Sequence, residues 1–338
     1  MAQIVYGVGT SHGPLLNLPP AEWEVRAEFD RAQTDLALRD GTFSFAELYA
    51  HRGGPHFAAK ATLDERTQRH AACQRQLDVL GERLDDINPD ALIIVGDDQH
   101  EWFMENTQPS FAVFCGDEMH NLAPTAEERE EKIRRGRGSD MYAYRPKIDQ
   151  VYPVVRDLAL RIHAQALEDE FDVAACMEQP KNPDGSLRTV GHAVGFIYRR
   201  LLRDRPVPVV PILVNTFYPP NQPTPKRCYD FGRSIGRAIH AWDSAARVAV
   251  IASGGISHFV VDEEWDHKML NAFRNGDIAT LTSEPNIMFR SGTSETKNWI
   301  VAAGILEATS LKMELLDYVP CYRTDAGTGS GMAFATWS

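Results

Sequence analysis

Residues 91–100 read ALIIVGDDQH, an apolar run that gives way to polar side chains and finishes at His100. A short apolar run of this kind is typical of a strand that is buried on both faces. Two other segments repeat the pattern: residues 4–12 read IVYGVGTSH, and residues 248–258 read VAVIASGGISH. Each of the three expected strands therefore leads into a loop that carries a histidine, namely His12, His100 and His258.

Strand-like and helix-like segments alternate along the rest of the chain. Strands are expected at residues 3–9, 91–96, 111–115, 171–176, 207–214 and 247–252. Helices are expected near residues 63–86, 150–168, 193–203, 228–242, 264–274 and 295–308. This order predicts an α/β fold with a mixed, mainly parallel central sheet flanked by helices. The ends of parallel strands share one edge, where such folds bind ligands, so we expect the three histidines to meet in one metal-dependent site.

Two segments are too long to be simple connections. Residues 17–62 show a mixed helical pattern around a central Gly-Gly-Pro, and we expect a helical insertion that covers the site as a lid. Residues 116–148 contain TAEEREEKIRRGRGSD, which is typical of an exposed helix followed by a flexible glycine-containing loop. Since no Pro/Gly/Ser linker separates two self-contained patterns, residues 1–338 are expected to form a single domain.

The composition describes an ordinary globular chain with a surplus of acidic residues. Its 338 residues are 43% hydrophobic and 24% charged, and the formal net charge is −12. This charge disfavours a nucleic acid or an anionic membrane as partner, because both attract basic patches, and it favours a small organic substrate. The five cysteines are scattered, and we find neither a signal-like N-terminus nor an apolar run of about 18 residues. We therefore expect reduced thiols and a cytoplasmic protein.

Several common catalytic motifs are missing from the sequence. It contains no G-x-x-x-x-G-K-[ST] phosphate loop, no H-E-x-x-H zinc motif and no G-x-S-x-G nucleophile elbow. The GTGSG stretch at 327–331 is too close to the last residue to open a helix, and we interpret it as a tight loop against the substrate. A remaining interpretation is a centre of two histidines and one carboxylate, which suits Fe(II) because it leaves positions open for a substrate and O₂.

The carboxylate of such a centre has two possible sources. Glu263, Glu264 and Asp266 follow His258 closely, but acids at the start of a helix are stabilised by the helix dipole without any catalytic role. Glu295 opens an apolar helix after a glycine-containing turn, and from there its side chain can point into a crevice. A helix-start acid is an equally good interpretation of Glu295, so the residues alone leave the choice open.

Six short motifs, taken in order, resemble one known family. They read GTSHGP, DDQH, GHAVGF, NTFYPP, GGISHF and SETKNW. Together they resemble the class III extradiol ring-cleavage dioxygenases, of the type of the catalytic β subunit of protocatechuate 4,5-dioxygenase, over nearly the whole chain. The resemblance implies a single catalytic domain, a non-haem Fe(II) cofactor and a homodimer.

The resemblance also implies a ligand set for the iron. The family ligands fall on His12, His100 and Glu295. The second ligand usually sits in an Asp-His pair, whereas Gln99 stands between Asp98 and His100 here. Asp98 is therefore an alternative to His100 as the second ligand.

Two further histidines fall on residues of the family that act on the substrate. His258 corresponds to the acid/base histidine, a role that suits the ordinary pKa of a histidine side chain. His192 corresponds to a histidine beside the substrate. From the sequence alone, a helix-start histidine bonded to backbone is the better interpretation of His192.

The implied reaction cleaves the aromatic ring of a catecholic or gallate-type acid with O₂, and both oxygen atoms enter the product. The single-chain length and the insertion at 17–62 make 3-O-methylgallate or gallate the expected substrate. A carboxylated ring requires a cation or backbone donors at the far wall of the site. Contacts to the substrate are expected from the segments that hold Asn215, Thr216, Tyr218, Thr328 and Ser330.

Two other functions are compatible with the same residues. Relatives on this fold without dioxygenase activity act as binding or signalling proteins, although the retained ligand candidates argue against that function here. A Zn²⁺ hydrolase could use two histidines and a glutamate around a bound water. The identity of the metal and the dependence on O₂ separate these alternatives.

Overall fold

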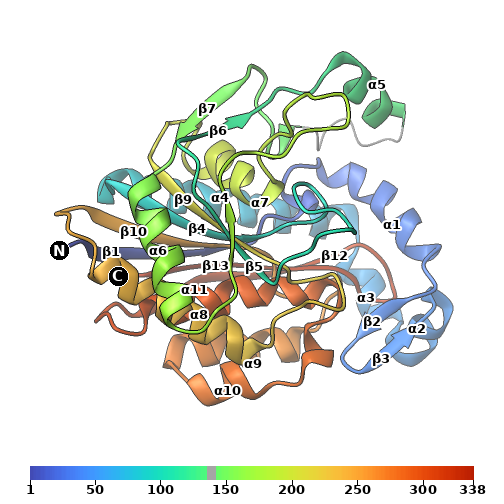
Figure 1. Cartoon of the computed structure of the whole chain (residues 1–338). Coiled ribbons are helices and arrows are strands. Elements are labelled where there is room, and N and C mark those ends of the chain that lie inside the picture. Colours follow the sequence, from blue (N-terminus) through green and yellow to red (C-terminus); the bar gives the residue numbers. More distant parts are fainter. Residues whose placement is uncertain (135–141) are drawn as a thin grey trace.

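A mixed β-sheet forms the centre of the computed structural model, which describes residues 1–134 and 142–338 (Figure 1). In these residues the strands follow the order β11 (His258–Val260), β13 (Thr328–Trp337), β1 (Gln3–Thr10), β10 (Arg247–Ser253), β4 (Ala91–Asp97), β9 (Val209–Val214), β5 (Phe111–Phe114) and β8 (Ala174–Cys176). A further strand, β12 (Met313–Tyr322), pairs with β13.

The middle of the sheet is parallel and its two sides contain the antiparallel pairs. β1, β10, β4 and β9 pair in parallel, as do β5 and β8. β5 is antiparallel to β9, and β13 is antiparallel to β1, β11 and β12. Each of the six expected strands is present, with ends that differ by up to three residues. The prediction of a mixed, mainly parallel sheet is therefore confirmed.

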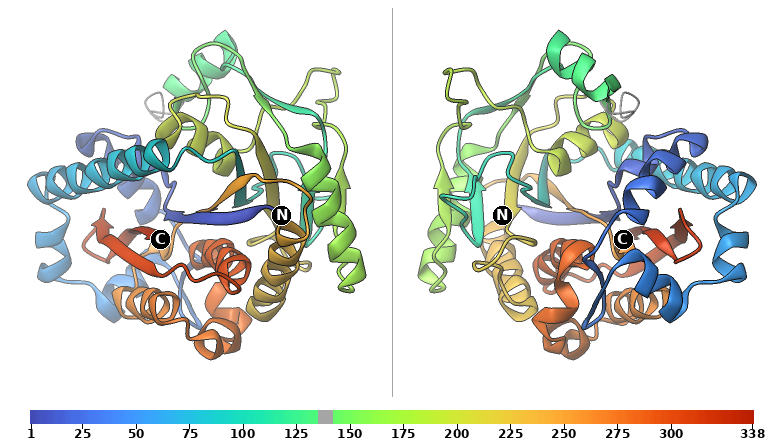
Figure 2. Two further views of the ribbon diagram at one scale, coloured as in Figure 1. Left: turned by 90° about the vertical axis from the view of Figure 1, so that its left-hand side faces the viewer. Right: turned by 90° about the vertical axis from the view of Figure 1, so that its right-hand side faces the viewer.

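Helices cover both faces of the sheet (Figure 2). Alternate residues of a strand point to opposite faces, and in β4 Ile93 and Val95 join one hydrophobic cluster while Leu92 and Ile94 join the other. The first cluster includes residues of α6 (Arg156–Glu168), α8 (Pro225–His240), α9 (Glu263–Asn275), α10 (Ile278–Ser283) and α11 (Thr296–Leu306). The second includes residues of α4 (Leu63–Ile87) and α7 (His192–Phe196). No helix in the described ranges is both long and apolar enough to cross a membrane.

Helix α11 packs very closely against the sheet. A Cβ atom at Gly9 of β1 would lie 2.4 Å from the ring of Trp299, so the tryptophan can cross the strand only where the side chain is absent. Trp299 is fully buried, and its indole N–H donates to the carbonyl of Gly254 at 3.0 Å. The contact fixes the start of α11, next to Glu295, against the ends of β1 and β10.

The structure corrects two predictions of secondary structure. The helix expected at 150–168 begins only at Arg156, because Gln150–Pro153 form strand β7 and pair with β6 (Glu118–Asn121). The GTGSG stretch is not a loop, since Thr328 starts β13 and pairs with Val260 of the neighbouring strand β11. Glycine and other small residues have a low intrinsic preference for strands, which explains why the sequence does not predict β13.

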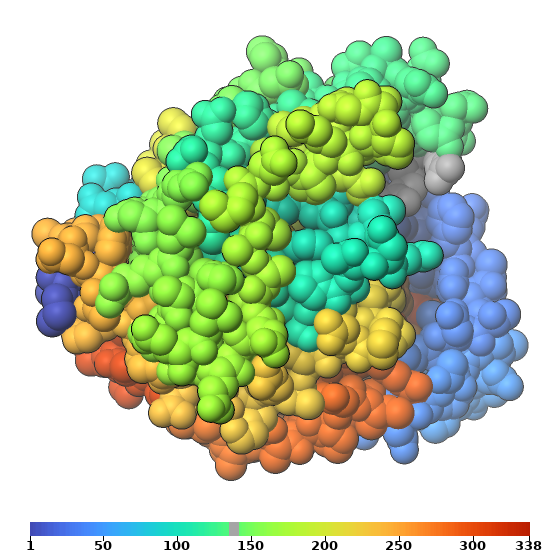
Figure 3. All heavy atoms as spheres, in the orientation of Figure 1, coloured from blue at the N-terminus to red at the C-terminus, as the bar shows by residue number. Residues whose placement is uncertain are grey.

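The insertion at 17–62 is mainly helical, as expected, with a small hairpin in addition. It comprises α1 (Trp23–Arg31), β2 (Leu36–Leu38), β3 (Gly41–Phe43), α2 (Phe45–Arg52) and α3 (Pro55–Lys60). This segment forms the blue surface on the right of Figure 3. The exposed helix expected in 116–148 is α5 (Ala126–Arg134). The glycine-containing loop expected after it falls on residues 135–141, outside the described residues.

A buried ion pair anchors α1 to the sheet. The carboxylate of Asp30 accepts hydrogen bonds from Arg323 Nε at 2.8 Å and Nη2 at 3.1 Å. It also accepts one from the hydroxyl of Thr328, at 2.6 Å, at the start of β13. All three side chains are buried. The insertion is thus tied to the strand next to β1.

We expect Asp30→Ala to lower the free energy of unfolding by about 3–5 kcal/mol, because the buried guanidinium of Arg323 loses its counter-charge. Arg31→Ala is the matched control on the same helix, since Arg31 pairs with Glu24 at 2.7 Å while both side chains are partly exposed. The control should cost less than about 1 kcal/mol. Urea denaturation measures both, and an equally small loss in the two variants would contradict the anchoring role.

Candidate metal centre

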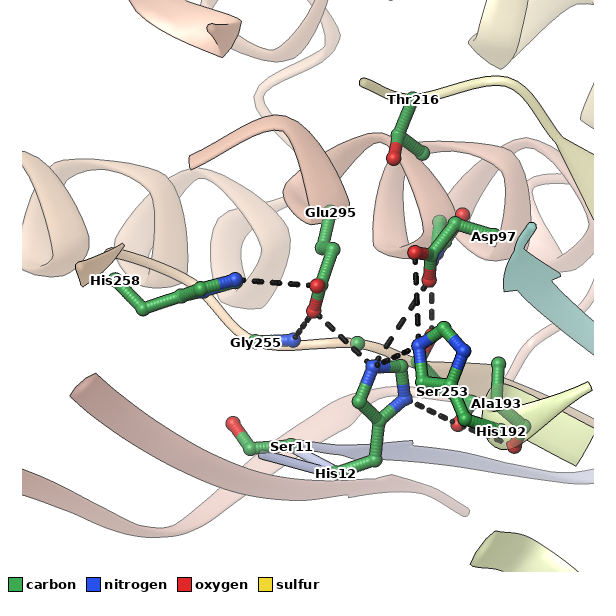
Figure 4. Close-up of polar contacts among 12 residues, drawn as sticks. Ser11, His12, Asp97, His192, Ala193, Thr216, Ser253, Gly255, His258 and Glu295 are labelled. Carbon is green, nitrogen blue, oxygen red and sulfur yellow. Dashed lines mark hydrogen bonds and ion pairs between the residues drawn. The ribbon is translucent and has the colours of Figure 1, made fainter. Parts of the chain in front are cut away.

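Four side chains from distant parts of the chain converge at the carboxyl edge of the parallel strands (Figure 4). His12 follows β1, Asp97 ends β4, His192 begins α7, and Glu295 closes the 3-10 turn Ser291–Glu295 before α11. One potential ligand atom from each lies within 4.8 Å of those of the other three. This edge is where α/β sheets place their ligands.

His12 is held so that Nε2 faces the cluster. Its Nδ1 lies 2.9 Å from the hydroxyl of Ser253, and that hydroxyl donates its own proton to the carbonyl of Ala193 at 2.8 Å. Because the hydroxyl proton is already used, Nδ1 of His12 must carry the proton of this hydrogen bond. In the neutral ring, Nε2 then presents a free lone pair, as a metal-binding nitrogen requires.

His192 is oriented in the same way by a carboxylate. Its Nδ1 lies 2.8 Å from Glu101 Oε2, and its backbone N–H donates to Glu101 Oε1 at 2.8 Å. Its Nε2 lies 3.1 Å from His12 Nε2, and the two rings meet nearly at right angles. Carboxylate partners of this kind fix the tautomer of metal-binding histidines.

Glu295 connects the cluster to His258. Oε2 of Glu295 lies 3.3 Å from His12 Nε2 and accepts the backbone N–H of Gly255 at 2.7 Å. Oε1 lies 3.1 Å from His258 Nε2. His258 therefore contacts the carboxylate from the side opposite to His12, as Figure 4 shows.

The charges of the cluster favour a cation at its centre. Burial acts to lower the pKa of His192, but the carboxylates of Glu101 and Asp97 outweigh it and raise that pKa to about 10. Burial likewise opposes ionisation of Glu295, yet the imidazoles of His258 and His12 hold its pKa well below the usual range. The buried carboxylates thus require positive charge nearby, which either protons on the histidines or a bound metal ion supplies.

The distances also suit one metal ion. Two nitrogen ligands at about 2.1 Å from an ion, and at roughly right angles, are separated by about 3 Å. The Nε2 atoms of His12 and His192 are 3.1 Å apart, and the carboxylate of Glu295 is 3.3 Å from His12. Asp97 is more distant from His12, at 3.9 Å, and lies 3.7 Å from His192. Judged by the distances from His12, the side chains of His12, His192 and Glu295 supply a set of two histidines and one carboxylate.

The structure does not bring His100 to this cluster. Its ring stacks on Tyr218, with centroids 3.6 Å apart and planes 11° apart. The residue before it, Gln99, points its amide to Asp97 at 3.2 Å and to Glu295 at 3.4 Å. The amide of Gln99 thus lies beside the centre in place of the imidazole of His100.

Asp98, the alternative second ligand, is also directed elsewhere. Its two carboxylate oxygens accept the backbone N–H groups of Trp102 at 2.8 Å and Phe103 at 3.1 Å. These bonds close the turn after β4. Burial raises the pKa of Asp98 to about 6.

A cavity of about 380 Å³ opens onto the cluster. Its walls include His12, His192, Glu295 and His258, together with the apolar side chains Phe196, Phe259 and Met332. An aromatic ring can therefore contact apolar walls while its polar substituents face the histidines and the carboxylate.

The expected substrate-binding residues divide into two groups. Ser330 lines the cavity. Asn215 bonds through its side chain to the backbone of Tyr218, and Thr216 accepts from Lys297 Nζ at 3.4 Å, so both support the loop after β9. Thr328 donates to Asp30. Of the five, only Ser330 is placed along the described wall of the cavity.

Several residues of the site are not predicted from the sequence, among them Asp97 of the cluster itself. Glu101 orients His192, Ser253 orients His12, and Arg26 of α1 lines the cavity. Ser253 lies at the end of an expected strand, which is the only signal for it. The sequence around Glu101 and around Arg26 is typical of a charged surface. Only the tertiary structure brings these two side chains to the site.

Comparison with known proteins identifies the family to which the chain belongs. Residues 55–329 match the family described as the catalytic LigB subunit of aromatic ring-opening dioxygenase. The chain belongs to this family. The match to the LigB family includes His192, His258 and Glu295, and it begins after His12 and after most of the insertion at 17–62.

Curated relatives are similar over part of the chain. Gallate dioxygenase of Pseudomonas putida is 28% identical over 177 residues, which cover 48% of this chain and 49% of that protein. Two proteins named 2,3-dihydroxyphenylpropionate/2,3-dihydroxicinnamic acid 1,2-dioxygenase are similar as well. The one from Paraburkholderia phymatum is 27% identical over 188 residues, covering 56% of this chain and 49% of its own. The one from Burkholderia vietnamiensis is 28% identical over 177 residues, which cover 52% of this chain and 45% of that protein. The matches thus span about half the length of each relative.

Proposed function

We propose that this LigB-family chain is an Fe(II)-dependent extradiol dioxygenase that opens the ring of a catecholic or gallate-type compound with O₂. The observation that carries the proposal is the convergence on His12 Nε2 of His192 Nε2, at 3.1 Å, and of a Glu295 carboxylate oxygen, at 3.3 Å, with all three ligand atoms within 4.8 Å of one another. We assign these three residues as the ligands, so that His192 takes the ligand role that the family resemblance implies for His100. Gln99 would support the site from its side, because its amide donates to Asp97 at 3.2 Å and to Glu295 at 3.4 Å.

When held by His12, His192 and Glu295, an Fe(II) ion would supply the chemistry that lets a diol and O₂ react. The other chemistry belongs to the side chains. His258 is the acid/base: it takes the proton of a phenolic hydroxyl as the substrate binds and returns a proton as the ring opens. Its contact with Glu295 at 3.1 Å places Nε2 at the edge of the centre. The apolar walls hold the ring and exclude water.

The substrate class is proposed from the relatives. A gallate dioxygenase is among the similar proteins, and we propose gallate or 3-O-methylgallate as the substrate. A homodimer, a cytoplasmic location and a lid function of the insertion stay predictions. Size-exclusion chromatography coupled to light scattering tests the first of these.

The direct test is O₂ uptake by protein that has been purified anaerobically and loaded with Fe(II). Gallate, 3-O-methylgallate, protocatechuate and catechol are presented in turn while the absorbance of the ring is followed. Uptake with loss of the ring absorbance on one phenol supports the proposal and identifies the substrate. Zinc-loaded protein is the control and should not consume O₂. Full iron loading without uptake on any phenol would contradict the dioxygenase function.

Removal of the metal is expected to destabilise the fold measurably. The ligands follow β1, begin α7 and precede α11, so an ion that binds only the folded chain holds these segments together. At a free Fe(II) concentration of 100 times Kd, the stabilisation is about 2.7 kcal/mol. Anaerobic urea denaturation with and without a chelator measures this difference. A denaturation midpoint that does not respond to Fe(II) would mean that the cluster does not bind the ion.

A further inference from the structure

The acids that follow His258 in the sequence do not share one environment. Asp266, on the first turn of α9, is fully buried, whereas the side chain of Glu264 is largely exposed. Oδ2 of Asp266 accepts hydrogen bonds from the hydroxyl of Ser257, at 2.6 Å, and from the phenol of Tyr318. The helix dipole alone does not account for Asp266, because an acid that only stabilises a helix start can stay in solvent.

The hydroxyl of Ser257 has both of its hydrogen-bonding roles filled. It accepts the backbone N–H of Asp262 at 3.0 Å, and it donates its own proton to Asp266. The backbone carbonyl of Ser257 accepts the N–H of Gly331 at 2.6 Å. The side chain and the backbone of Ser257 are thus held at the same time, by the start of α9 and by β13.

The carboxylate of Asp266 has little room to move. A Cβ atom at Gly331 would lie 2.3 Å from Oδ2 of Asp266 and 3.2 Å from the hydroxyl oxygen of Ser257, so β13 can approach the pair only because the side chain is absent. Oδ1 of Asp266 is buried and has no hydrogen-bond partner among the described residues. Burial raises the pKa of Asp266 to about 7. A buried oxygen left without a partner is costly, and such a group calls for an explanation by its task.

The fixed residue Ser257 immediately precedes His258 and therefore determines where the imidazole starts. His258 begins β11 and pairs with Ser330 of β13. A Cβ atom at Gly292 would lie 1.6 Å from the carbonyl oxygen of His258, so the turn that ends at Glu295 packs directly on the backbone of His258. A displacement of Ser257 would thus change the contact of 3.1 Å between His258 Nε2 and Glu295 (Figure 4).

We propose that Asp266 is a positioning residue that acts through Ser257 and holds the imidazole of His258 where proton transfer to and from the substrate takes place. The proposal rests on the proposed function and deepens it, because it names a residue on which the acid/base step depends. Within the described part of the chain Asp266 does not line the cavity, so it acts on the reaction only through its neighbours.

The first test measures kcat and KM of Fe(II)-loaded variants on the phenol that the O₂-uptake assay identifies. Asp266→Ala removes the acceptor and Ser257→Ala removes the donor. Each should lower kcat by about 10- to 100-fold, since a misplacement of about 1 Å can cost about 100-fold. KM should change less than about twofold, because substrate binding is not affected, and the iron content should stay the same. Asp266→Asn keeps an acceptor oxygen and should recover most of kcat; equal loss in the Asn and Ala variants would contradict a role through this hydrogen bond.

Ser234→Ala is the matched control, because it makes the same chemical change elsewhere in the molecule. Ser234 of α8 is fully buried and donates to Asp169 at 2.6 Å, away from the described lining of the cavity. This variant should lose a similar amount of stability in urea denaturation and keep its kcat. Equal kcat in Ser257→Ala and Ser234→Ala would overturn the proposal.

A background without the imidazole separates positioning from a general loss of structure. In His258→Gln protein, the additional change Asp266→Ala should have no further effect on kcat, because residues that act as a unit are not additive. The same fold-decrease in both backgrounds would mean that Asp266 supports the fold alone, and would reject the proposal. Circular dichroism identifies a variant that fails to fold. Should Asp266→Ala fail, Ser257→Ala takes its place in both backgrounds.

A measurement without turnover separates failure of the positioning from failure of the proposed function. Nitrogen-15 NMR of metal-free protein with labelled histidine records the ring of His258, whose signals are those missing in His258→Gln. Ser257→Ala should shift or broaden these signals, and Ser234→Ala should leave them unchanged. That result supports the positioning even if no phenol is cleaved. Ring cleavage with unchanged signals and unchanged kcat in Ser257→Ala supports the dioxygenase and rejects the positioning.

Discussion

His192→Ala is expected to lose Fe(II) binding and ring cleavage together, whereas His100→Ala should keep both. The reason is geometric: His192 Nε2 lies 3.1 Å from His12 Nε2, while the ring of His100 is stacked on Tyr218. Loss of a ligand should weaken iron binding by more than the factor of about 10 to 100 that loss of a supporting partner costs. Iron content after desalting and anaerobic calorimetry measure the two variants.

Glu101→Gln gives an intermediate case that tests the same assignment. The amide keeps the size of the side chain but weakens the hydrogen bond that orients His192, so iron affinity should fall by about 10- to 100-fold without being abolished. His12→Ala and Glu295→Ala should behave like His192→Ala, because each removes a ligand. Iron loss in His100→Ala with full retention in His192→Ala would restore the ligand set implied by the family motifs.

His258→Ala is expected to keep iron and lose turnover. His258 contacts the centre only through Glu295, at 3.1 Å, so its removal leaves the three proposed ligands in place. General acid/base catalysis contributes typically about 10²- to 10⁴-fold, and kcat should fall by this factor. Stopped-flow absorbance with saturating substrate gives kcat, and metal analysis gives the iron content.

His258→Gln is the companion variant, since it keeps a polar side chain without a titrating group. It should be as slow as the alanine variant while binding substrate normally. Substitution of His267, a histidine of α9 that is absent from the described wall of the cavity, provides the control and should leave kcat unchanged. Loss of iron in His258→Ala would mean that the base and a ligand have been exchanged in our assignment.

Much of the frame of the site could be predicted from the sequence. The apolar runs that precede His12, His100 and His258 form β1, β4 and β10, which are neighbours in the sheet, because buried parallel strands need continuous apolar residues. Their shared edge brings His12 and His258 together around Glu295. The side chain of Glu295 does face the cavity. From the sequence alone, a helix-start acid without a role in the site was an equally good interpretation.

The identity of the second nitrogen ligand could not be predicted. His100 follows the right strand, but the turn closed by Asp98 carries its ring to Tyr218. His192 reaches the centre only because α7 packs over β4, where a Cβ at Gly96 would lie 2.4 Å from the side chain of Ala193. The close packing of α7 on β4 joins residues about 100 positions apart, and no local sequence pattern indicates it. The strand β13 escapes prediction for the different reason that its first residues are small.

The two ends of the cavity are built from different kinds of structure. The end at the cluster of His12, His192 and Glu295 consists of strand ends and helix starts that are locked into the core, whereas Arg26 and Lys132 belong to segments added outside the alternation of strands and helices. Exchange of these surface segments would therefore change the outer wall of the cavity and leave the cluster intact.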